Sequence, residues 1–264
     1  MSRVKTPAQR KMIRAEVVRT HRTSPSFVTL TIGGPDLAHF VPAGFDQCVR
    51  LFFRRDGQRE LAMPTRSNNV WVAQHMMSRT ATRPWVRNYT VRAFRPDSLE
   101  MDIEFALHGD DTPATAFATK ASEGDPVGIF DEGVGYWPTK DTQLLVADES
   151  AVPAALAILD HAPQDLRAHV YLEVPRTADI RNLDTPPGVT VHWIARDDSP
   201  ELPGQPALRT LKAADLPDGP LYTWVAGESA LATGLRRHLV QDRKMPKSDV
   251  TFLGYWRHGK ASLG

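Results

Sequence analysis

The chain has 264 residues, enough for two domains of ordinary size, and its 41% hydrophobic content is typical of a folded protein rather than a disordered one. Lys and Arg number 32 and Asp and Glu number 31, which argues against the strongly basic surface of a nucleic-acid-binding protein. A single cysteine, Cys48, excludes an internal disulfide and any four-cysteine zinc or iron–sulfur site. We therefore expect no nucleic-acid partner and no bound metal.

The first residues, MSRVKTPAQRKMIRAEVV, are basic but lack the apolar run of a secretory signal. No segment of the chain approaches the roughly 18 consecutive apolar residues that span a membrane. We expect a cytoplasmic protein that does not insert into a membrane.

Short apolar runs with turn residues between them fill the chain up to about Ile129. In MDIEFALH, alternate residues from Met101 to Leu107 are apolar and share one face of a predicted strand. Similar runs lie at Val28–Ile32, Val49–Phe53 and Val70–Ala73. Several short strands at this spacing predict a closed antiparallel β-barrel.

The stretch RNYTVRAF places three different functional groups close together on one predicted strand. Arg87 and Tyr89 would point to one face and Thr90 to the other. A guanidinium can bind phosphate, a phenol ring can stack on an aromatic ring, and a hydroxyl can reach the edge of that aromatic ring. The three groups therefore suit a planar ligand with a charged tail, provided that a twist or bulge turns Thr90 toward the same face. A barrel strand with one solvated Arg and one packed Tyr explains the same alternation.

A second candidate anion site lies in LHGDDTPATAF, where a strand ends at His108 and a helix begins near Thr112–Pro113. With Thr112 as its cap, the free N–H groups of that helix start would attract a phosphate. The alternative is a capped surface helix that binds nothing.

After the Gly- and Pro-rich segment Asp131–Asp141, strands and helices alternate, which predicts a parallel α/β sheet. Ser150 could cap a helix that has Pro153 in its first turn. In a later helix, every fourth residue from Leu231 to Leu239 is leucine and lines one face. The predicted strands are QLLVA, AHVYLEV, VTVHWIA, LYTWVAG and DVTFLGYW. We assign residues 1–137 to the β-barrel domain and residues 138–264 to the α/β domain.

VADES (Val146–Ser150) and VAGES (Val225–Ser229) are matching turns at the carboxyl ends of two predicted parallel strands. Open α/β sheets bind nucleotides at this edge, although neither turn carries the G-x-G-x-x-G fingerprint. Asp148 and Glu149 could act as acid or base there, or they could be capping or solvated groups.

Six stretches of the chain, in this order and at these separations, resemble the siderophore-interacting proteins, which are flavin-dependent ferric-siderophore reductases. They are DQCVRLFF, RNYTVRAF, MDIEFALHG, ADESAVPA, VAGESA and GYWRHG. The R-x-Y-T signature also occurs across the wider ferredoxin-reductase-like superfamily, and the combination of ADES with the terminal GYWRHG narrows the resemblance. It runs from about Arg14 to Gly259 and implies a six-stranded FAD-binding barrel followed by a nicotinamide-nucleotide domain.

The resemblance also implies roles for individual residues. Arg87 would bind the FAD phosphates, Tyr89 would lie against the isoalloxazine ring, and Thr90 would sit near the flavin N5, so that Tyr89 and Thr90 are the catalytic candidates. Further FAD contacts would come from Val91, Asp102, His108, Thr112, Ala114 and Thr115. The nicotinamide nucleotide would be bordered by Asp148, Glu149, Ser150, Gly227 and Glu228, with Tyr255 and Trp256 closing over the cofactors.

Two departures from the family pattern concern the helix start. Thr112 stands where the family usually has Gly, and Phe117 stands where it usually has Trp, so the phosphate turn can differ in shape. A smaller departure is Ala147, at a position where the family usually has Gly.

The implied activity is electron transfer from NADPH or NADH through FAD to a ferric siderophore. Oxygen donors hold Fe(III) far more tightly than Fe(II), so one electron would loosen the complex. Arg176 and Arg181 favour NADPH because an Arg can bind its 2′-phosphate, whereas Glu173 would favour NADH. A reduced ferredoxin is an alternative donor.

An anionic ferric siderophore would meet basic side chains near the exposed flavin edge, each of which could instead be simply solvated. The candidates are Arg54, Arg55, Arg257, His258 and Lys260. Two other functions stay open at this point: a general flavin reductase that serves another electron acceptor, and a siderophore-binding protein without flavin. We expect a monomer.

Overall fold

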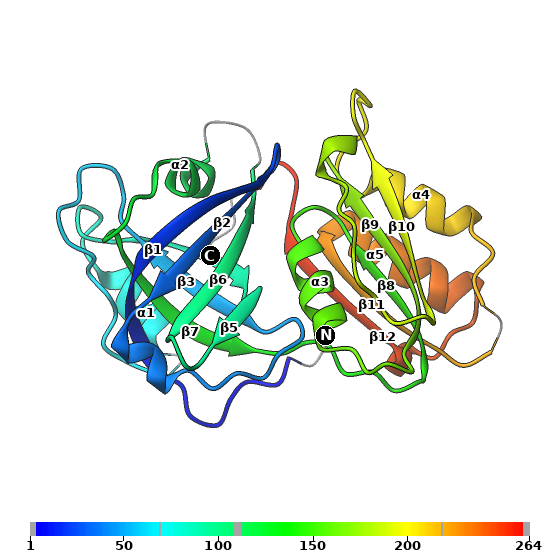
Figure 1. The fold of residues 1–264 in the computed structure, drawn as a ribbon, viewed down its shortest axis with the longest axis horizontal. Coiled ribbons are helices and arrows are strands. Elements are labelled where there is room, and N and C mark those ends of the chain that lie inside the picture. Colours follow the sequence, from blue (N-terminus) through cyan, green and yellow to red (C-terminus); the bar gives the residue numbers. More distant parts are fainter. Residues whose placement is uncertain (1–3, 69, 108–111, 218, 261–264) are drawn as a thin grey trace. The chain divides into compact units, whose positions relative to one another are not determined.

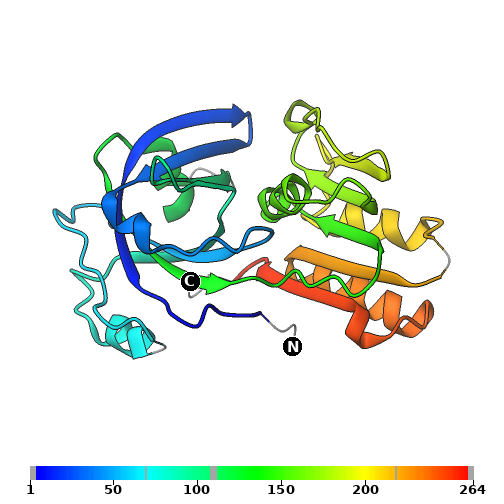
Figure 2. The ribbon, with the colours of Figure 1, turned by 60° about the horizontal axis from the view of Figure 1, so that its bottom comes forward.

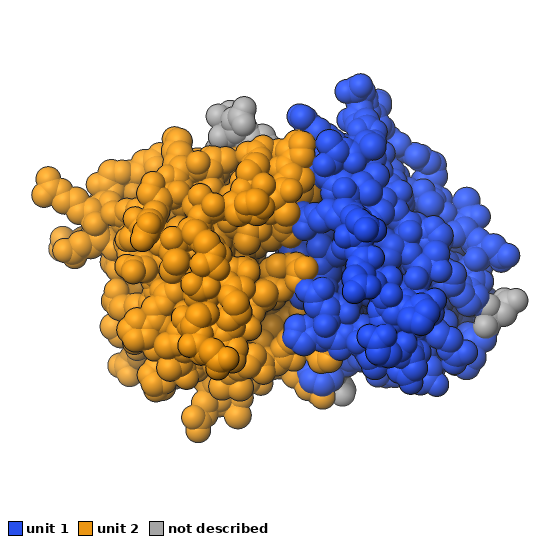
Figure 3. Space-filling model, in the orientation of Figure 1, with its two compact units in different colours: residues 1–4, 135–262 blue, residues 5–134, 263–264 orange. Residues whose placement is uncertain are grey.

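The computed structural model describes residues 4–68, 70–107, 112–217 and 219–260. Two compact units divide this part of the chain (Figure 3). Residues 5–134 form the N-terminal unit, and residues 135–260 together with Val4 form the C-terminal unit. Each unit has its own buried apolar core.

The N-terminal unit is built on an antiparallel sheet with the strand order β4-β3-β7-β1-β2-β6-β5. The long strand β1 pairs with β7 over its first residues and with β2 over the rest, so the sheet curls strongly around its core (Figure 2). The strands are β1 (Met12–Ser24), β2 (Phe27–Gly33), β3 (Cys48–Phe53), β4 (Trp85–Thr90), β5 (Ala93–Arg95), β6 (Glu100–Ala106) and β7 (Pro126–Gly133). The short helices are a 3₁₀ turn (Pro35–His39), α1 (Val70–Met77) and α2 (Pro113–Lys120).

One chain segment joins the two ends of this strand order. The N–H of Val91 donates to the carbonyl of Gln47 beside β3 (2.8 Å), whereas the N–H of Arg92 donates to the carbonyl of Asp102 in β6 (2.9 Å). The segment expected as one strand therefore changes partner at these residues and is divided into β4 and β5. This division explains why the described sheet has seven strands where six were expected.

The prediction of a strand at Val70–Ala73 is wrong, because these residues form the first turn of α1. Within the helix only Trp71 is buried, where its ring meets Phe52 edge-on at 5.4 Å between centroids. Val70 and Val72 are exposed. A run of four residues is too short to distinguish the alternation of a strand from one helical turn with a single anchored side chain.

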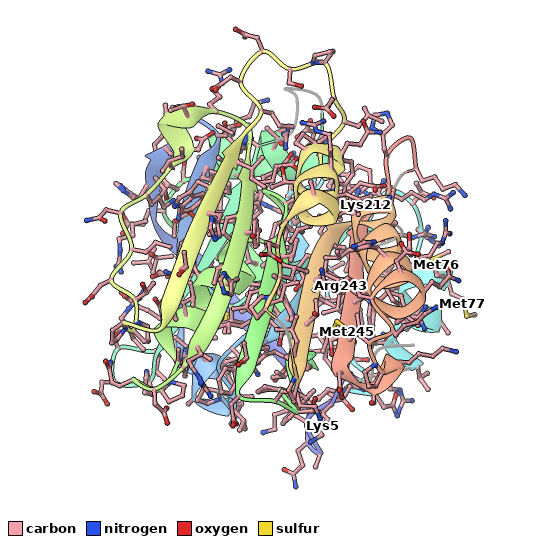
Figure 4. The ribbon with its side chains drawn as sticks, turned by 90° about the vertical axis from the view of Figure 1, so that its right-hand side faces the viewer. Lys5, Met76, Met77, Lys212, Arg243 and Met245 are labelled. Carbon is pink, nitrogen blue, oxygen red and sulfur yellow. The ribbon has the colours of Figure 1, made fainter. Side chains whose placement is uncertain are left out.

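The C-terminal unit is a parallel sheet in the order β10-β9-β8-β11-β12, as the sequence predicts. Helix α3 covers one face of the sheet, and α4 and α5 cover the other (Figures 1 and 4). The strands are β8 (Thr142–Ala147), β9 (Arg167–Val174), β10 (Val189–Ala195), β11 (Leu221–Glu228) and β12 (Val250–Trp256). The helices are α3 (Val152–Asp160), α4 (Gln205–Ala213), α5 (Ser229–Arg237) with a π turn (His238–Asp242), and 3₁₀ turns at Thr177–Asp179 and Lys247–Asp249.

Local signals in this half of the sequence are mostly confirmed. Leu231, Leu235 and Leu239 are buried in the core beneath α5. Pro153 lies in the first turn of α3, but Ser150 does not cap that helix, because Ala151 occupies the cap position. Nowhere in the described ranges does a helix have the length and apolar character needed to cross a membrane.

The anchoring of α1 by one side chain gives a testable expectation. Trp71→Ala should lower the free energy of unfolding of the N-terminal unit by about 3–5 kcal/mol, because it empties a site lined by Phe52 and Phe130. Val72→Ala on the exposed face of the same helix should change it by less than about 0.5 kcal/mol. Urea unfolding of the full chain measures both values. Equal effects of the two substitutions would contradict the assigned packing of α1.

Candidate functional site

The side chains of β4 differ in burial along the strand. Val86 and Thr90 are buried, with 4% and 5% of their surface exposed, and Asn88 between them is exposed. On the other face Trp85, Arg87 and Tyr89 are partly buried, and the Trp85 and Tyr89 rings pack against the core cluster. The strand is therefore not sealed inside the protein, and one of its faces presents an indole, a guanidinium and a phenol in a row. This is the face that the R-x-Y-T stretch predicts as a ligand platform.

Tyr89, at the end of this row, packs against an aromatic side chain of the core. The Tyr89 ring packs on Phe105 with 4.2 Å between centroids and a tilt of 44°. Burial raises the pKa of the Tyr89 phenol, and the nearby Arg87 partly offsets this effect. Tyr89 is therefore a neutral, well-supported ring with part of its surface free for stacking.

Two guanidinium groups gather around Trp85. The Arg55 guanidinium lies 3.8 Å from the ring centroid and that of Arg87 lies 5.2 Å away. Burial lowers the pKa of Arg87, and the charge of Arg55 lowers it further. Within the described part of the chain neither group forms an ion pair, and the buried Nε of Arg55 has no hydrogen-bond partner. Two desolvated cations without a carboxylate partner suit an anionic ligand.

A hollow of about 530 Å³ adjoins Trp85, a volume typical of small-molecule sites. The β3–α1 loop lines it with Arg54 and Arg55, and α2 lines it with Pro113, Phe117 and Lys120. Arg54 is itself held by Asp125 at 2.5 Å, so its charge is partly neutralised.

The start of α2 has the predicted form. The side-chain oxygen of Thr112 accepts a hydrogen bond from the Thr115 N–H (3.2 Å), which confirms Thr112 as the cap. Ala114 is partly buried and Thr115 is buried. His108 lies outside the described residues. Phe117 stacks on Phe53 at 4.6 Å between centroids, so the ring that replaces the family's usual Trp fills the space between α2 and the sheet.

Two of the predicted FAD contacts have structural partners of their own. Val91 belongs to the core of the N-terminal unit. Asp102 accepts hydrogen bonds from Arg95, at 2.7 Å on each of its two oxygens, and from the Thr31 hydroxyl (2.7 Å). Burial raises the pKa of Asp102, but these hydrogen bonds outweigh it and the pKa is lowered. The carboxylate therefore ties β5 and β2 to β6.

A single buried carboxylate joins the two matching turns of the C-terminal unit. Asp148 Oδ1 accepts from the N–H (2.9 Å) and hydroxyl (2.6 Å) of Ser150, and Oδ2 accepts from the Glu228 N–H (2.6 Å) and the Trp256 Nε1–H (3.1 Å). Gly227 has a φ of 136°, and a Cβ there would lie 2.5 Å from Asp148 Cγ, so only glycine fits. Burial, and then the charge of Glu149, raise the pKa of Asp148 to about 6.

A second buried network continues along the same edge. Arg196, directly after β10, donates to both oxygens of Glu149 (2.6 and 2.8 Å) and to Glu173 (2.6 Å). Glu173 also accepts from the N–H groups of Gly204 and Ala207 (2.7 and 2.9 Å). Glu173, the residue expected to favour NADH, is fully buried. Sequence reasoning missed Arg196, because its two partners lie 47 and 23 residues away in the chain and no local pattern joins them to it.

The terminal turn after β12 carries three of the predicted substrate residues. Arg257, His258 and Lys260 are exposed, and the Lys260 N–H donates to the Arg257 carbonyl (3.1 Å). The His258 N–H donates to Glu228 (3.1 Å), which also caps α5. The five predicted substrate residues therefore form two groups, Arg54 with Arg55 in one unit and this turn in the other. Tyr255 and Trp256 are partly buried, Arg176 is exposed and Arg181 is partly buried.

Comparison with known proteins identifies the family. The family model of the siderophore-interacting FAD-binding domain matches residues 16–135, and that of the siderophore-interacting protein matches residues 140–259. The chain belongs to the siderophore-interacting protein family. Ferric vibriobactin reductase ViuB of Vibrio cholerae is 30% identical to it over 253 residues, which cover 93% of this chain and 89% of the relative.

Solved members of the family share the fold. A siderophore utilization protein from T. fusca is 30% identical with a TM-score of 0.84, and the match covers 99% of this chain and 98% of that one. The siderophore-interacting protein SipS from Aeromonas hydrophila is 29% identical with a TM-score of 0.80, covering 97% and 94%. A ferredoxin NADP+ reductase from Neisseria gonorrhoeae, 13% identical with a TM-score of 0.57, shares the fold alone.

The match to the siderophore-interacting FAD-binding domain makes FAD the cofactor of the N-terminal unit. The residues of the N-terminal unit fit FAD on grounds of their own. The Arg55 Nε, which has no partner among the residues that the structure describes, offers an anion site. The partly exposed Tyr89 ring offers a stacking surface, and the adjoining hollow offers space for a nucleotide.

The four hydrogen bonds to Asp148 give a second prediction. In Asp148→Asn at pH 8, the side-chain NH₂ cannot accept from the donors that now meet the carboxylate, so the free energy of unfolding of the C-terminal unit should fall by about 2–3 kcal/mol. Asp165→Asn, which changes an exposed carboxylate of the same unit, is the matched control and should be neutral. Urea unfolding measures both. A neutral Asp148→Asn would contradict the assigned role of this carboxylate.

Proposed function

We propose that the chain is a ferric-siderophore reductase, an FAD-dependent NAD(P)H oxidoreductase that releases siderophore-bound Fe(III) as Fe(II). The observation that carries this proposal is the face of β4 where Arg87 and Tyr89 are partly exposed beside Trp85 and Arg55, whose buried Nε has no hydrogen-bond partner among the described residues. It occurs in a chain that is 30% identical to a ferric vibriobactin reductase across 93% of its length. A ferric acinetobactin reductase of Acinetobacter baumannii, 29% identical over 183 residues, matches 68% of the chain.

Bound FAD supplies the chemistry that joins a two-electron donor to a one-electron acceptor. The task of the protein is to hold and orient it. We assign the isoalloxazine to the free surface of Tyr89, supported by Phe105, and the diphosphate to Arg87 with Arg55. The capped start of α2 adds free N–H groups for the same anion. Thr90 is buried at the end of β4, just before the segment stops pairing with β3. We assign its hydroxyl to the edge of the isoalloxazine ring.

We assign the nicotinamide nucleotide to the 138–264 domain, at the carboxyl edge of its sheet. The carboxylates of Asp148, Glu149 and Glu173 are held inside the protein, so their role is to fix this edge rather than to transfer protons. The exposed Arg176 favours NADPH over NADH because it can meet a 2′-phosphate, and Glu173 is too buried to oppose it. A reduced ferredoxin remains an alternative donor.

The ferric siderophore is the proposed acceptor. Arg257, His258 and Lys260 are exposed on one turn and can attract an anionic complex. The contacts of Arg54 with Asp125 and of Arg55 with Trp85 favour a role at the FAD phosphates over a role in siderophore binding. Reduction releases the iron because oxygen donors bind Fe(II) much more weakly.

Arg87→Ala tests the FAD site. Loss of a charge-assisted hydrogen bond of about 1.5–3 kcal/mol should raise the Kd for FAD roughly ten- to a hundredfold. Arg87→Lys keeps the charge but loses the forked donor, so its Kd for FAD should lie between those of the unchanged protein and Arg87→Ala. The control Arg14→Ala, on the exposed face of β1, should have the Kd of the unchanged protein. Fluorescence titration of the apoprotein gives the three constants. If Arg87→Ala binds FAD normally, Arg87 is only a surface residue.

The choice of acceptor tests the activity itself. Steady-state oxidation of NADPH and of NADH should be measured with a ferric siderophore, free flavin, oxidised ferredoxin and a simple ferric chelate under anaerobic conditions. We expect the highest kcat/KM with the ferric siderophore and one of the two nucleotides. Equal or faster turnover of the other acceptors would identify a general flavin reductase, and absence of flavin from the purified and reconstituted protein would identify a binding protein.

A further inference from the structure

Helix α1 exposes apolar side chains that no part of the proposed reductase site uses. Met77 is 86% exposed, Val70 54%, Met76 52% and Val72 47%. Met76 and Met77 project outward from α1 in Figure 4. Four large apolar side chains on a helix of eight residues form a continuous exposed patch rather than the scattered apolar residues of an ordinary surface.

The sequence around this helix is strongly cationic. Residues 61–96 contain no Asp or Glu, although the whole chain carries nearly equal numbers of acids and bases. The arginines in this range are Arg66, Arg79, Arg83, Arg87, Arg92 and Arg95. Arg66 and Arg79 lie on either side of α1 in the chain and both are exposed. The apolar patch is therefore flanked by positive charge.

The patch is held in place by a dedicated set of contacts. Trp71 anchors the helix in the core, and Arg83 Nη2 donates to the carbonyls of Met76 (2.6 Å) and Ser78 (2.7 Å) at its end. Gln74 accepts from the Thr65 N–H (3.0 Å) and donates to the Thr65 hydroxyl (3.1 Å). These bonds keep the apolar residues directed outward although burial against the sheet would be favourable.

We propose that α1 is an interfacial segment that rests on an anionic lipid surface. The aliphatic and thioether side chains would enter the boundary between headgroups and acyl chains, while Arg66 and Arg79 would meet the lipid phosphates. Flexible, unbranched methionines suit such a disordered environment. Membrane contact of this kind needs no spanning segment, and the proposal does not depend on the reductase activity.

Two features disfavour a second copy of the chain as the partner. In a twofold dimer the same surface meets itself, so the arginines on either side of α1 would lie close to those of the second copy and repel them. In addition, an eight-residue helix is only about 12 Å long, far too small for the roughly 800 Å² per partner of a stable interface. An acidic protein would satisfy the charges, but it would need a groove matched to a convex helix, whereas a lipid surface needs none.

Vesicle co-sedimentation of the FAD-loaded full chain tests the proposal. The protein should bind vesicles of mixed phosphatidylglycerol and phosphatidylcholine, bind pure phosphatidylcholine at least about tenfold more weakly, and lose binding at high salt. Met76→Ser combined with Met77→Ser should lower the partition coefficient about tenfold or more. Arg66→Gln combined with Arg79→Gln should remove the preference for anionic lipid. The matched control, Ile180→Ser, changes a side chain that is 42% exposed in the other unit and should bind like the unchanged protein.

Flavin content and urea unfolding check that each variant is folded, which the exposure of all the substituted residues predicts. Failure of the unchanged protein to bind anionic vesicles would overturn the proposal, as would equal binding to neutral vesicles or normal binding by the double methionine variant. Gel filtration tests whether a second copy of the chain binds the patch. A dimer that the methionine substitutions dissociate would assign the patch to that second copy.

Discussion

The change of hydrogen-bond partner at Val91 and Arg92 is the constraint on which the candidate FAD site depends. The chain pairs with β3 up to this point and with β6 beyond it. The sheet is closed by this single segment, and the face of β4 that carries Trp85, Arg87 and Tyr89 keeps access to solvent. Neighbouring strands pair along the edges of β4, so this pairing leaves the face that carries the three side chains uncovered.

The C-terminal unit meets a different requirement with buried charge. Asp148 connects β8 to β11 and β12, and the group of Glu149, Glu173 and Arg196 connects β8 to β9, β10 and the start of α4. A buried carboxylate is tolerated only when its oxygens are satisfied, and here they are. The result is a rigid edge at the carboxyl ends of the parallel strands, where we propose that the nucleotide binds. Electron transfer between cofactors needs orientation more than acid–base catalysis, which agrees with the absence of a free acid among these three carboxylates.

Sequence reasoning succeeded where short-range physics decides the outcome. Alternation predicted the antiparallel sheet, continuous apolar runs predicted the five parallel strands, and Thr112 with Pro113 predicted the start of α2. It failed where contacts distant in sequence decide. Arg196 meets Glu149 from 47 residues away, and Arg55 stacks on Trp85 through the fold rather than through a motif. The helix at Val70 was mistaken for a strand because its single anchor, Trp71, belongs to a tertiary cluster.

A crystal structure of the chain with FAD bound would test the central claim most directly. The account predicts the isoalloxazine against the Tyr89 ring, with the diphosphate within hydrogen-bonding distance of the Arg87 guanidinium and close to Arg55. A flavin bound elsewhere, with the face of β4 covered by protein and Arg87 paired to a carboxylate, would contradict it.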